Sequence, residues 1–128
     1  MDGTFIIAEV GINHNGDIKK AYELIERAAA TGANAIKFQT AIPELVVSKH
    51  AQKANYQKTS TENDESQLEM IRKNHLPLTA YEKLKKTCEE RGIMFFSSAF
   101  EYLSQCLCAF LYHAYQIIFF LLLSQPLP

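Results

Sequence analysis

Two short apolar segments near the start of the chain are separated by an amphipathic one. Phe5–Val10 (FIIAEV) and Asn34–Thr40 (NAIKFQT) are rich in branched and aromatic residues, which predicts two strands, the first of them buried. Between them, Asp17 can cap a helix that Gly32 ends, with an apolar stripe made of Ala21, Leu24, Ile25 and Ala28. A strand, a helix and a second strand in close succession predict a βαβ unit, whose two strands are parallel.

The pattern continues after a long polar segment at residues 41–63, which we expect to be a functional or mobile loop. Ser66 and Glu69 have capping-box spacing and predict a short helix, and Thr79 and Glu82 predict a longer one in the same way. Met94–Phe100 (MFFSSAF) then predicts a third strand. This order of elements predicts an α/β protein with a parallel sheet, both faces of which need to be covered.

The last part of the chain breaks the pattern. Residues 106–123 (CLCAFLYHAYQIIFFLLL) include no charged residue, and their length suits a membrane span. His113 and Gln116 lie inside the segment and no Lys or Arg flanks it, which argues against a span. The other interpretations are a buried helix without its partners, or the product of a truncation or frameshift, which we favour. We therefore predict an N-terminal domain part at residues 1–105 and a divergent, hydrophobic, helical tail at residues 106–128.

Composition narrows the classes of partner and the compartment. Thirteen Lys and Arg against fourteen Asp and Glu give a net charge of −1, which favours neither nucleic acid nor an anionic membrane as a partner. The three cysteines form no CxxC pair and are odd in number, so a disulfide framework is not expected. The N-terminus lacks the basic and apolar regions of a signal peptide. A location in the cytoplasm is the expectation.

Alternation along the three predicted strands brings four polar side chains together. In a (β/α) barrel, alternate side chains of each strand point inward, and active sites lie at the carboxyl ends of the strands. By this rule the first strand supplies Glu9, the second Lys37 and Gln39, and the third Ser98. One carboxylate, one ammonium, one amide and one hydroxyl are therefore expected at one rim of the sheet.

These groups suit an anionic substrate that also carries hydroxyls. An ammonium beside a hydroxyl and an amide can bind a phosphate or a carboxylate. Glu9 could accept hydrogen bonds from sugar hydroxyls or act as an acid or base. The structural alternative is a buried ion pair between Glu9 and Lys37. His14, in the loop after the first strand, could be a base, a metal ligand or a partner that orders the loop, and we favour the last; the four histidines define no metal site by their spacing.

Four stretches of the chain resemble one enzyme family. They are IIAEVGINHNGD, GANAIKFQT, KANYQ…DESQLEMIRK and GIMFFSSAF, and in order and spacing they are similar to the N-terminal part of the sialic acid synthases (N-acetylneuraminate synthases) and of the related legionaminic and pseudaminic acid synthases. The resemblance covers residues 4–105. It implies an incomplete TIM-type (β/α) barrel with about the first three β/α units.

The resemblance also implies a reaction. Family members condense phosphoenolpyruvate with an open-chain N-acetylated amino sugar, such as N-acetylmannosamine, to give a sialic acid and phosphate. C3 of phosphoenolpyruvate attacks the sugar aldehyde, water adds at C2, and the tetrahedral intermediate loses phosphate. A divalent metal, Mn or Mg, assists. The family enzymes are homodimers with a small antifreeze-like domain after the barrel.

Carried over by position, the resemblance assigns roles to the same four residues. Glu9 matches the glutamate that contacts the sugar, and it is the expected catalytic residue. Lys37 and Gln39 match the lysine and glutamine of the second strand, with the lysine holding phosphoenolpyruvate. Ser98 stands where the family usually has a threonine, and Ala99 replaces a usual proline.

The family's metal ligands come from later strands that have no counterpart in this sequence, and a complete barrel needs about 250 residues. We therefore expect the 128-residue polypeptide alone to be inactive. The alternatives are a non-catalytic fragment that binds full-length synthase subunits through a sheet edge, a legionaminic acid synthase fragment, and a protein tethered to a membrane by its tail.

Overall fold

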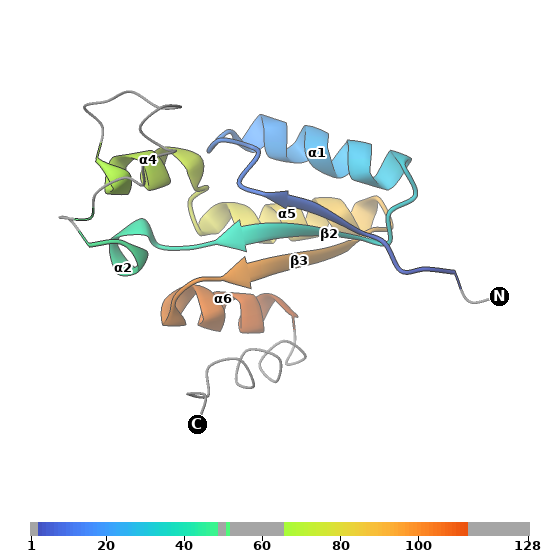
Figure 1. Ribbon diagram of the computed structural model, residues 1–128. Coiled ribbons are helices and arrows are strands. Elements are labelled where there is room, and N and C mark those ends of the chain that lie inside the picture. Colours follow the sequence, from blue (N-terminus) through green and yellow to red (C-terminus); the bar gives the residue numbers. More distant parts are fainter. Residues whose placement is uncertain (1–2, 49–50, 52–65, 113–128) are drawn as a thin grey trace.

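A parallel sheet forms the centre of the computed structural model, which describes residues 3–48, 51 and 66–112 (Figure 1). Its strands are β1 (Ile7–Gly11), β2 (Ala35–Thr40) and β3 (Met94–Ala99). They lie in the order β1-β2-β3, and both pairs are parallel. The predicted α/β class and the parallel sheet are confirmed.

The described residues form three longer helices and two short ones beside the sheet. They are α1 (Ile18–Ala30), α2 (Pro43–Val46), α4 (Gln67–Asn74), α5 (Thr79–Glu90) and α6 (Tyr102–Tyr112). The helices α1 and α5 contact each other and cover one face of the sheet, and α6 packs beside β3 (Figure 1). The short helices α2 and α4 lie beyond the ends to which the strand arrows point. The carboxyl ends of the strands therefore lie next to the α2–α4 region.

Local capping explains where α1 and α4 begin. The carboxylate of Asp17 accepts the backbone N–H of Lys19 at 2.8 Å, as predicted for the start of α1. Ser66 and Glu69 form both hydrogen bonds of a capping box at the start of α4. The box predicted at Thr79 is wrong. The residue at the cap position is Leu78, which has helical backbone angles and makes no side-chain cap. Thr79 therefore already lies within the first turn of α5.

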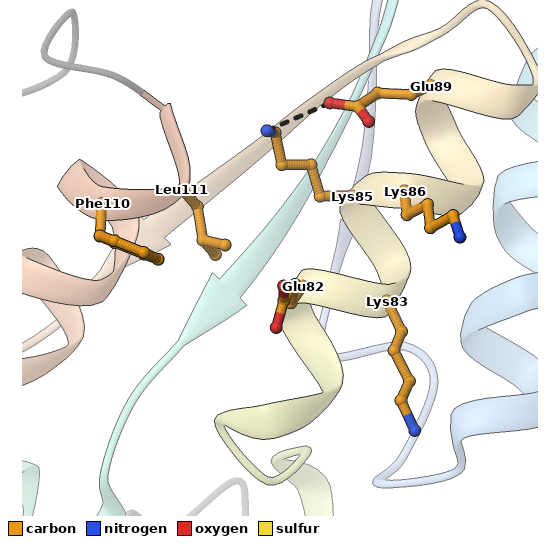
Figure 2. Close-up of a pocket in the computed structure, with 7 residues that line it drawn as sticks. All are labelled: Glu82, Lys83, Lys85, Lys86, Glu89, Phe110 and Leu111. Atoms are coloured by element: carbon orange, nitrogen blue, oxygen red, sulfur yellow. Dashed lines mark ion pairs between the residues drawn. The ribbon is translucent and has the colours of Figure 1, made fainter.

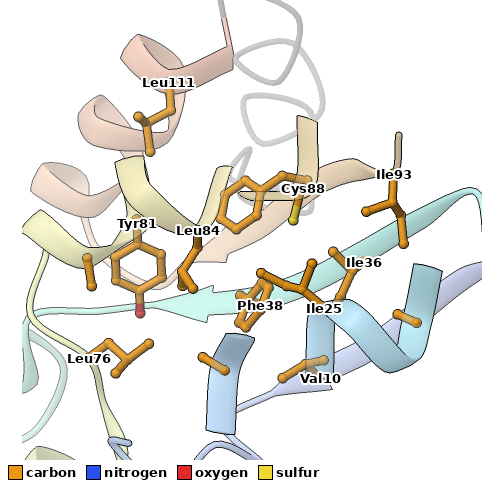
Figure 3. Packing of buried hydrophobic residues seen from close by; sticks show 14 residues of the cluster. Val10, Ile25, Ile36, Phe38, Leu76, Tyr81, Leu84, Cys88, Ile93 and Leu111 are labelled. Atoms are coloured by element: carbon orange, nitrogen blue, oxygen red, sulfur yellow. The ribbon is translucent and has the colours of Figure 1, made fainter. Parts of the chain in front are cut away.

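The core lies between the sheet and its covering helices (Figure 3). β2 contributes Ile36 and Phe38, which have no exposed surface, and Phe38 stacks on Phe95 of β3 with the ring centroids 5.4 Å apart. The helices contribute side chains that point into the same cluster, among them Ile25, Tyr81, Leu84 and Cys88. Burial raises the pKa of the Cys88 thiol to about 12, so this cysteine stays protonated and serves as part of the core.

The first strand differs from the prediction of a buried strand. Phe5, Ile6 and Ile7 are each about half exposed, whereas Val10 at the other end is buried in the core. Within the described sheet β1 is an edge strand, because β2 is its neighbour on one side and the other side has none. The alternation of side chains along β1 was predicted correctly, but the burial of its first half was not.

The helix α6 crosses the boundary predicted between residues 105 and 106. Its buried residues, Ser104, Cys108 and Leu111, pack toward β3 and the core, so the first residues of the predicted tail join the folded unit. Residues 113–128 lie outside the described part, and the division into two parts stays a prediction. Among the residues described, no helix has both the length and the apolar character needed to cross a membrane.

Candidate functional site

The four predicted residues lie on the face of the sheet opposite the one that α1 and α5 cover (Figure 1); among the described residues no helix covers this face, which is called the open face below. Glu9 pairs in register with Lys37, and Gln39 pairs with Ser98. Lys37, Gln39 and Ser98 are half-buried and Glu9 is exposed. Their neighbours Ile36 and Phe38 point to the opposite face and are fully buried. The structure therefore brings all four side chains to the face and the strand ends that alternation predicted.

A direct ion pair joins the two charged members of this group. The Nζ atom of Lys37 lies 2.7 Å from Oε2 of Glu9, and the two side chains are 39% and 50% exposed. The pair anticipated as the structural alternative thus exists, but in the described structure it is open to solvent. Ion pairs of this kind contribute little to stability, because water screens both charges. Both groups are therefore accessible to a charged ligand.

A β-bulge shapes the space beside this pair. The register of β1 against β2 shifts between Glu9 and Gly11, and Gly11 has a positive φ of 56°. A Cβ atom at this position would lie 3.4 Å from both Nε2 of Gln39 and Oε1 of Glu9. The missing side chain of Gly11 leaves the space between these two polar groups open. Sequence reasoning missed this role of Gly11. A glycine two residues after Glu9, near the end of the strand, was the signal that could have indicated a bulge.

Buried hydrogen bonds on the covered side hold the ends of β2 and β3. The Tyr81 hydroxyl donates to the backbone carbonyl of Gln39 at 2.7 Å, and the hydroxyls of Thr40 and Ser97 lie 2.5 Å apart. Burial raises the pKa of Tyr81 to about 12, so its hydroxyl keeps its proton and remains a donor. Sequence reasoning missed these bonds because each joins residues far apart in the chain.

His14 orders the loop after β1, as expected. Its side chain is fully buried, and its Nδ1 accepts the backbone N–H of Gly16 at 3.1 Å. Burial, and then the nearby His75, lower the pKa of His14. The ring also stacks on Phe38 at 6.1 Å. The loop is pressed against α4, since a Cβ on Gly16 would overlap the backbone carbonyl oxygen of Lys73.

The described residues do not fit a divalent metal by themselves. No group of three His, Cys, Asp or Glu side chains close enough to bind one occurs in the described ranges. Glu9 is paired with Lys37, and Nδ1 of His14 accepts a backbone N–H. Among the described residues, Nε2 of His14 is buried without a hydrogen-bond partner, but it belongs to no group of three ligand side chains. The metal is implied by the resemblance alone.

A hollow of about 610 Å³ lies elsewhere, between α5 and α6 (Figure 2). Its walls combine an ion pair between Lys85 and Glu89 at 3.1 Å with the ring of Phe110, and they are completed by Glu82, Lys83, Lys86 and Leu111. None of the four predicted site residues lines it. The hollow lies on the helices and is separate from the strand ends, so it is not the candidate site.

Comparisons with known proteins agree with the geometry of the sheet. N,N'-diacetyllegionaminic acid synthase of Campylobacter jejuni is 46% identical over 101 residues, which are 79% of this chain and 30% of the relative. Human N-acetylneuraminate-9-phosphate synthase is 32% identical over 99 residues, which are 76% of this chain and 27% of the relative. The chain thus spans less than a third of the length of these relatives.

Solved structures show the same fold. The N-acetylneuraminic acid (sialic acid) synthetase of Leptospira borgpetersenii superposes with a TM-score of 0.66 at 24% identity, covering 87% of this chain and 34% of that one. A barrel of parallel strands with helices outside it accounts for a parallel sheet that has helices on one face.

A family profile supplies the most direct assignment. The profile described as the NeuB family matches residues 24–119, well over half of the chain. The matched range includes Lys37, Gln39 and Ser98, and it extends beyond the described end of α6. The chain therefore belongs to the NeuB family.

Proposed function

We propose that this chain supplies the first part of the active site of a sialic acid-type synthase. The reaction is the condensation of phosphoenolpyruvate with an N-acetylated amino sugar to give a sialic acid and phosphate. One observation carries the proposal: the pair Glu9–Lys37 and the in-register pair Gln39–Ser98 share one open rim of the sheet. The named synthases among the relatives support the same class of reaction.

In this proposal Lys37 binds the anionic substrate. Its ammonium lies 2.7 Å from the carboxylate of Glu9 and is partly exposed. An incoming phosphate or carboxylate can therefore bind the ammonium beside Glu9 or replace Glu9 as its partner. Ser98 and Gln39, which face each other across β2 and β3, add a hydroxyl and an amide as neutral donors. The charge and the two donors together suit phosphoenolpyruvate better than a neutral ligand.

Glu9 is the proposed catalytic residue, and it contacts the sugar. Once the anion occupies Lys37, the carboxylate of Glu9 is free to accept hydrogen bonds from the hydroxyls or the amide of the sugar, and the space beside Gly11 admits them. The sugar aldehyde carbon then faces C3 of phosphoenolpyruvate. A C–C bond forms there, and water adds at C2. One proton of this water balances the proton gained by the aldehyde oxygen. The C2–O bond to phosphate then breaks, C2 becomes the ketone, and the remaining proton leaves with phosphate.

The sugar is proposed to be N-acetylmannosamine or the related precursor of a legionaminic acid. The identity of 46% with a legionaminic acid synthase supports the second choice, and pseudaminic acid synthase of the same bacterium is 30% identical over 96 residues. As in the family, the complete site is proposed to belong to a cytoplasmic homodimer that uses Mn or Mg.

A chimera tests the proposal. Residues 4–105 of this chain replace the matching segment of the Campylobacter jejuni synthase, and formation of N,N'-diacetyllegionaminic acid is measured. We expect product, and we expect Lys37→Met in the chimera to reduce the rate at least about 100-fold, as loss of a charged substrate contact does. Lys20→Met on the exposed surface of α1 is the matched control and should leave the rate unchanged.

Two results would contradict the proposal. One is a folded chimera that forms no product, and the other is an unchanged rate after Lys37→Met. The 128-residue chain by itself is expected to release no phosphate from phosphoenolpyruvate and N-acetylmannosamine with Mn, because three described strands cannot close a barrel. Turnover by the purified chain would refute that expectation.

A second candidate function is binding to complete synthase subunits. The observation that favours it is the exposed apolar surface on the open side of the sheet, where Phe5, Ile7 and Met94 are each about half exposed. Co-purification of the chain with an intact synthase would support this function. A stringent pull-down that recovers no synthase would remove it.

A further inference from the structure

The chain leaves β2 and β3 in different directions, and one carboxylate lies between the two exits. Glu101 is the second residue after β3, and it directly precedes α6. Ile42 is the second residue after β2, and it directly precedes α2. The side chain of Glu101 therefore has access to both loops that follow the strands of the candidate site.

Four hydrogen bonds converge on this carboxylate. Oε1 accepts the backbone N–H of Ile42 at 3.2 Å and that of Ser104 at 3.0 Å, as well as the Ser104 hydroxyl. Oε2 accepts the backbone N–H of Leu103 at 2.7 Å. The bonds to Leu103 and Ser104 satisfy N–H groups in the first turn of α6, where a negative charge is also favourable. The bond to Ile42 reaches a different segment altogether.

The hydrogen bond from Ile42 to Glu101 is not needed to cap a helix. Serine, threonine or aspartate can cap a helix through the N–H groups of its first turn. The longer side chain of glutamate can satisfy those groups and still reach the loop after β2. The backbone ladder supports the same junction, since the N–H of Phe100 donates to the carbonyl of Thr40 at 3.1 Å.

The rim residues lie directly before this junction. Gln39 and Ser98 are paired across β2 and β3; Gln39 is three residues before Ile42, and Ser98 is three residues before Glu101 itself. On the covered side the bond between Thr40 and Ser97 fixes the same two strand ends. Beyond the backbone bond from Phe100 to Thr40, the link through Glu101 further joins the loop after β2 to the start of α6.

We infer that Glu101 is a positioning residue: it ties the loop after β2 to the start of α6 and so fixes how Gln39 and Ser98 face a shared anionic ligand. The inference rests on the proposed function for the identity of that ligand, phosphoenolpyruvate. The link between the loops is a property of the fold, so it can be tested separately.

The test compares Glu101→Ser with Glu101→Gln in the full 128-residue chain. Serine can still cap α6 but cannot reach Ile42, whereas glutamine keeps an oxygen where Oε1 lies. By amide exchange, Glu101→Ser should expose the Ile42 N–H about tenfold more, while Ser104 changes less than about threefold. The side-chain amide signals of Gln39 should shift as well. Glu101→Gln should retain most of the Ile42 protection, and Glu90→Ser, on the exposed side of α5, is the control and should change neither signal.

Phosphoenolpyruvate binding gives the second readout. By titration of the chimera, Glu101→Ser should weaken the affinity about threefold to tenfold, and Glu101→Gln should retain most of it. If the unsubstituted chimera binds no phosphoenolpyruvate, the proposed function fails, and the exchange and Gln39 signals of the 128-residue chain still decide the role of Glu101. Unchanged Ile42 exchange and unchanged Gln39 signals in Glu101→Ser would overturn the inference. If Glu101→Ser does not fold, equal protection of Ile42 in Glu101→Gln and the wild type supports it, and loss of that protection overturns it.

Discussion

The two faces of the same small sheet do different work. On the covered face, Ile36 and Phe38 have no exposed surface and pack against α1 and α5. On the open face, Lys37 and Gln39 alternate with them along the same strand and remain accessible. Alternate residues of one strand therefore contribute to the hydrophobic core and to the candidate site. The difference teaches that stability and ligand binding can be changed separately by choosing the face.

Two adjacent phenylalanines of β3 give the strongest test of this difference between the two faces. Phe95 is 6% exposed in the core, whereas Phe96 is half-buried on the open face. We expect Phe95→Ala to lower the free energy of unfolding by about 3–5 kcal/mol, because it leaves a cavity. Phe96→Ala should cost about 1–2 kcal/mol. Urea unfolding of the purified chain measures both, and equal losses would show that the open face is also core.

The loop between β1 and α1 gives the next largest effect. In Gly16→Ala the new methyl group overlaps the backbone carbonyl of Lys73, and the residue must also keep a φ of 72°. We expect a loss of at least about 2 kcal/mol. Gly32→Ala is the matched control, since its φ is 77° but nothing lies within 4 Å of the added atom, and it should cost about 1 kcal/mol. Similar losses in the two variants would mean that α4 does not press on the loop.

The buried histidine makes the covered side sensitive to acid. The pKa of His14 is lowered in the folded state, so the unfolded chain binds its proton more readily than the folded chain does. Its contribution to stability is therefore complete above the ordinary value of 6.5 and is lost as the pH falls below it. The loss should approach at most about 1.4 kcal/mol per pH unit.

His14→Asn tests this pH dependence. The asparagine oxygen can still accept the N–H of Gly16, but the side chain does not titrate. Urea unfolding at pH 7.5 and pH 5.5 should show a smaller decline in the variant than in the wild type. The same decline in the variant and the wild type would place the acid sensitivity at another group.

The smallest expected effect on stability belongs to the open face. Lys37→Met removes a solvent-exposed ion pair and should change the free energy of unfolding by less than about 1 kcal/mol. The same substitution is expected to abolish most of the activity of the chimera. A large loss of stability in urea unfolding would instead identify the pair with Glu9 as structural.

Local patterns in the sequence were sufficient for the strands and their faces. The alternation of Lys37 and Gln39 with Ile36 and Phe38 can be recognised within the six residues of β2, because side chains of a strand alternate between its two faces. Asp17 and the Ser66 box are equally local. The rim of the candidate site followed from this alternation and from the rule for strand ends in barrels.

Contacts between distant residues could not be predicted in that way. The bond from Tyr81 to Gln39 and the bond from Ile42 to Glu101 depend on how the helices pack, and no local period records that. The bulge at Gly11 and the exposure of the first half of β1 likewise follow from the neighbours of the strand. The capping box at Thr79 failed because the preceding Leu78 had already adopted helical angles.

The contact between Gly16 and α4 bears on the order in which the protein is made. The loop after β1 is synthesised before β2, whereas the helix end against which it packs, at Lys73, is synthesised only after all of β2. The unit formed by β1 and α1 therefore cannot complete its packing during synthesis until α4 has emerged. Folding of the first strand is thereby coupled to translation of the second half of the described chain.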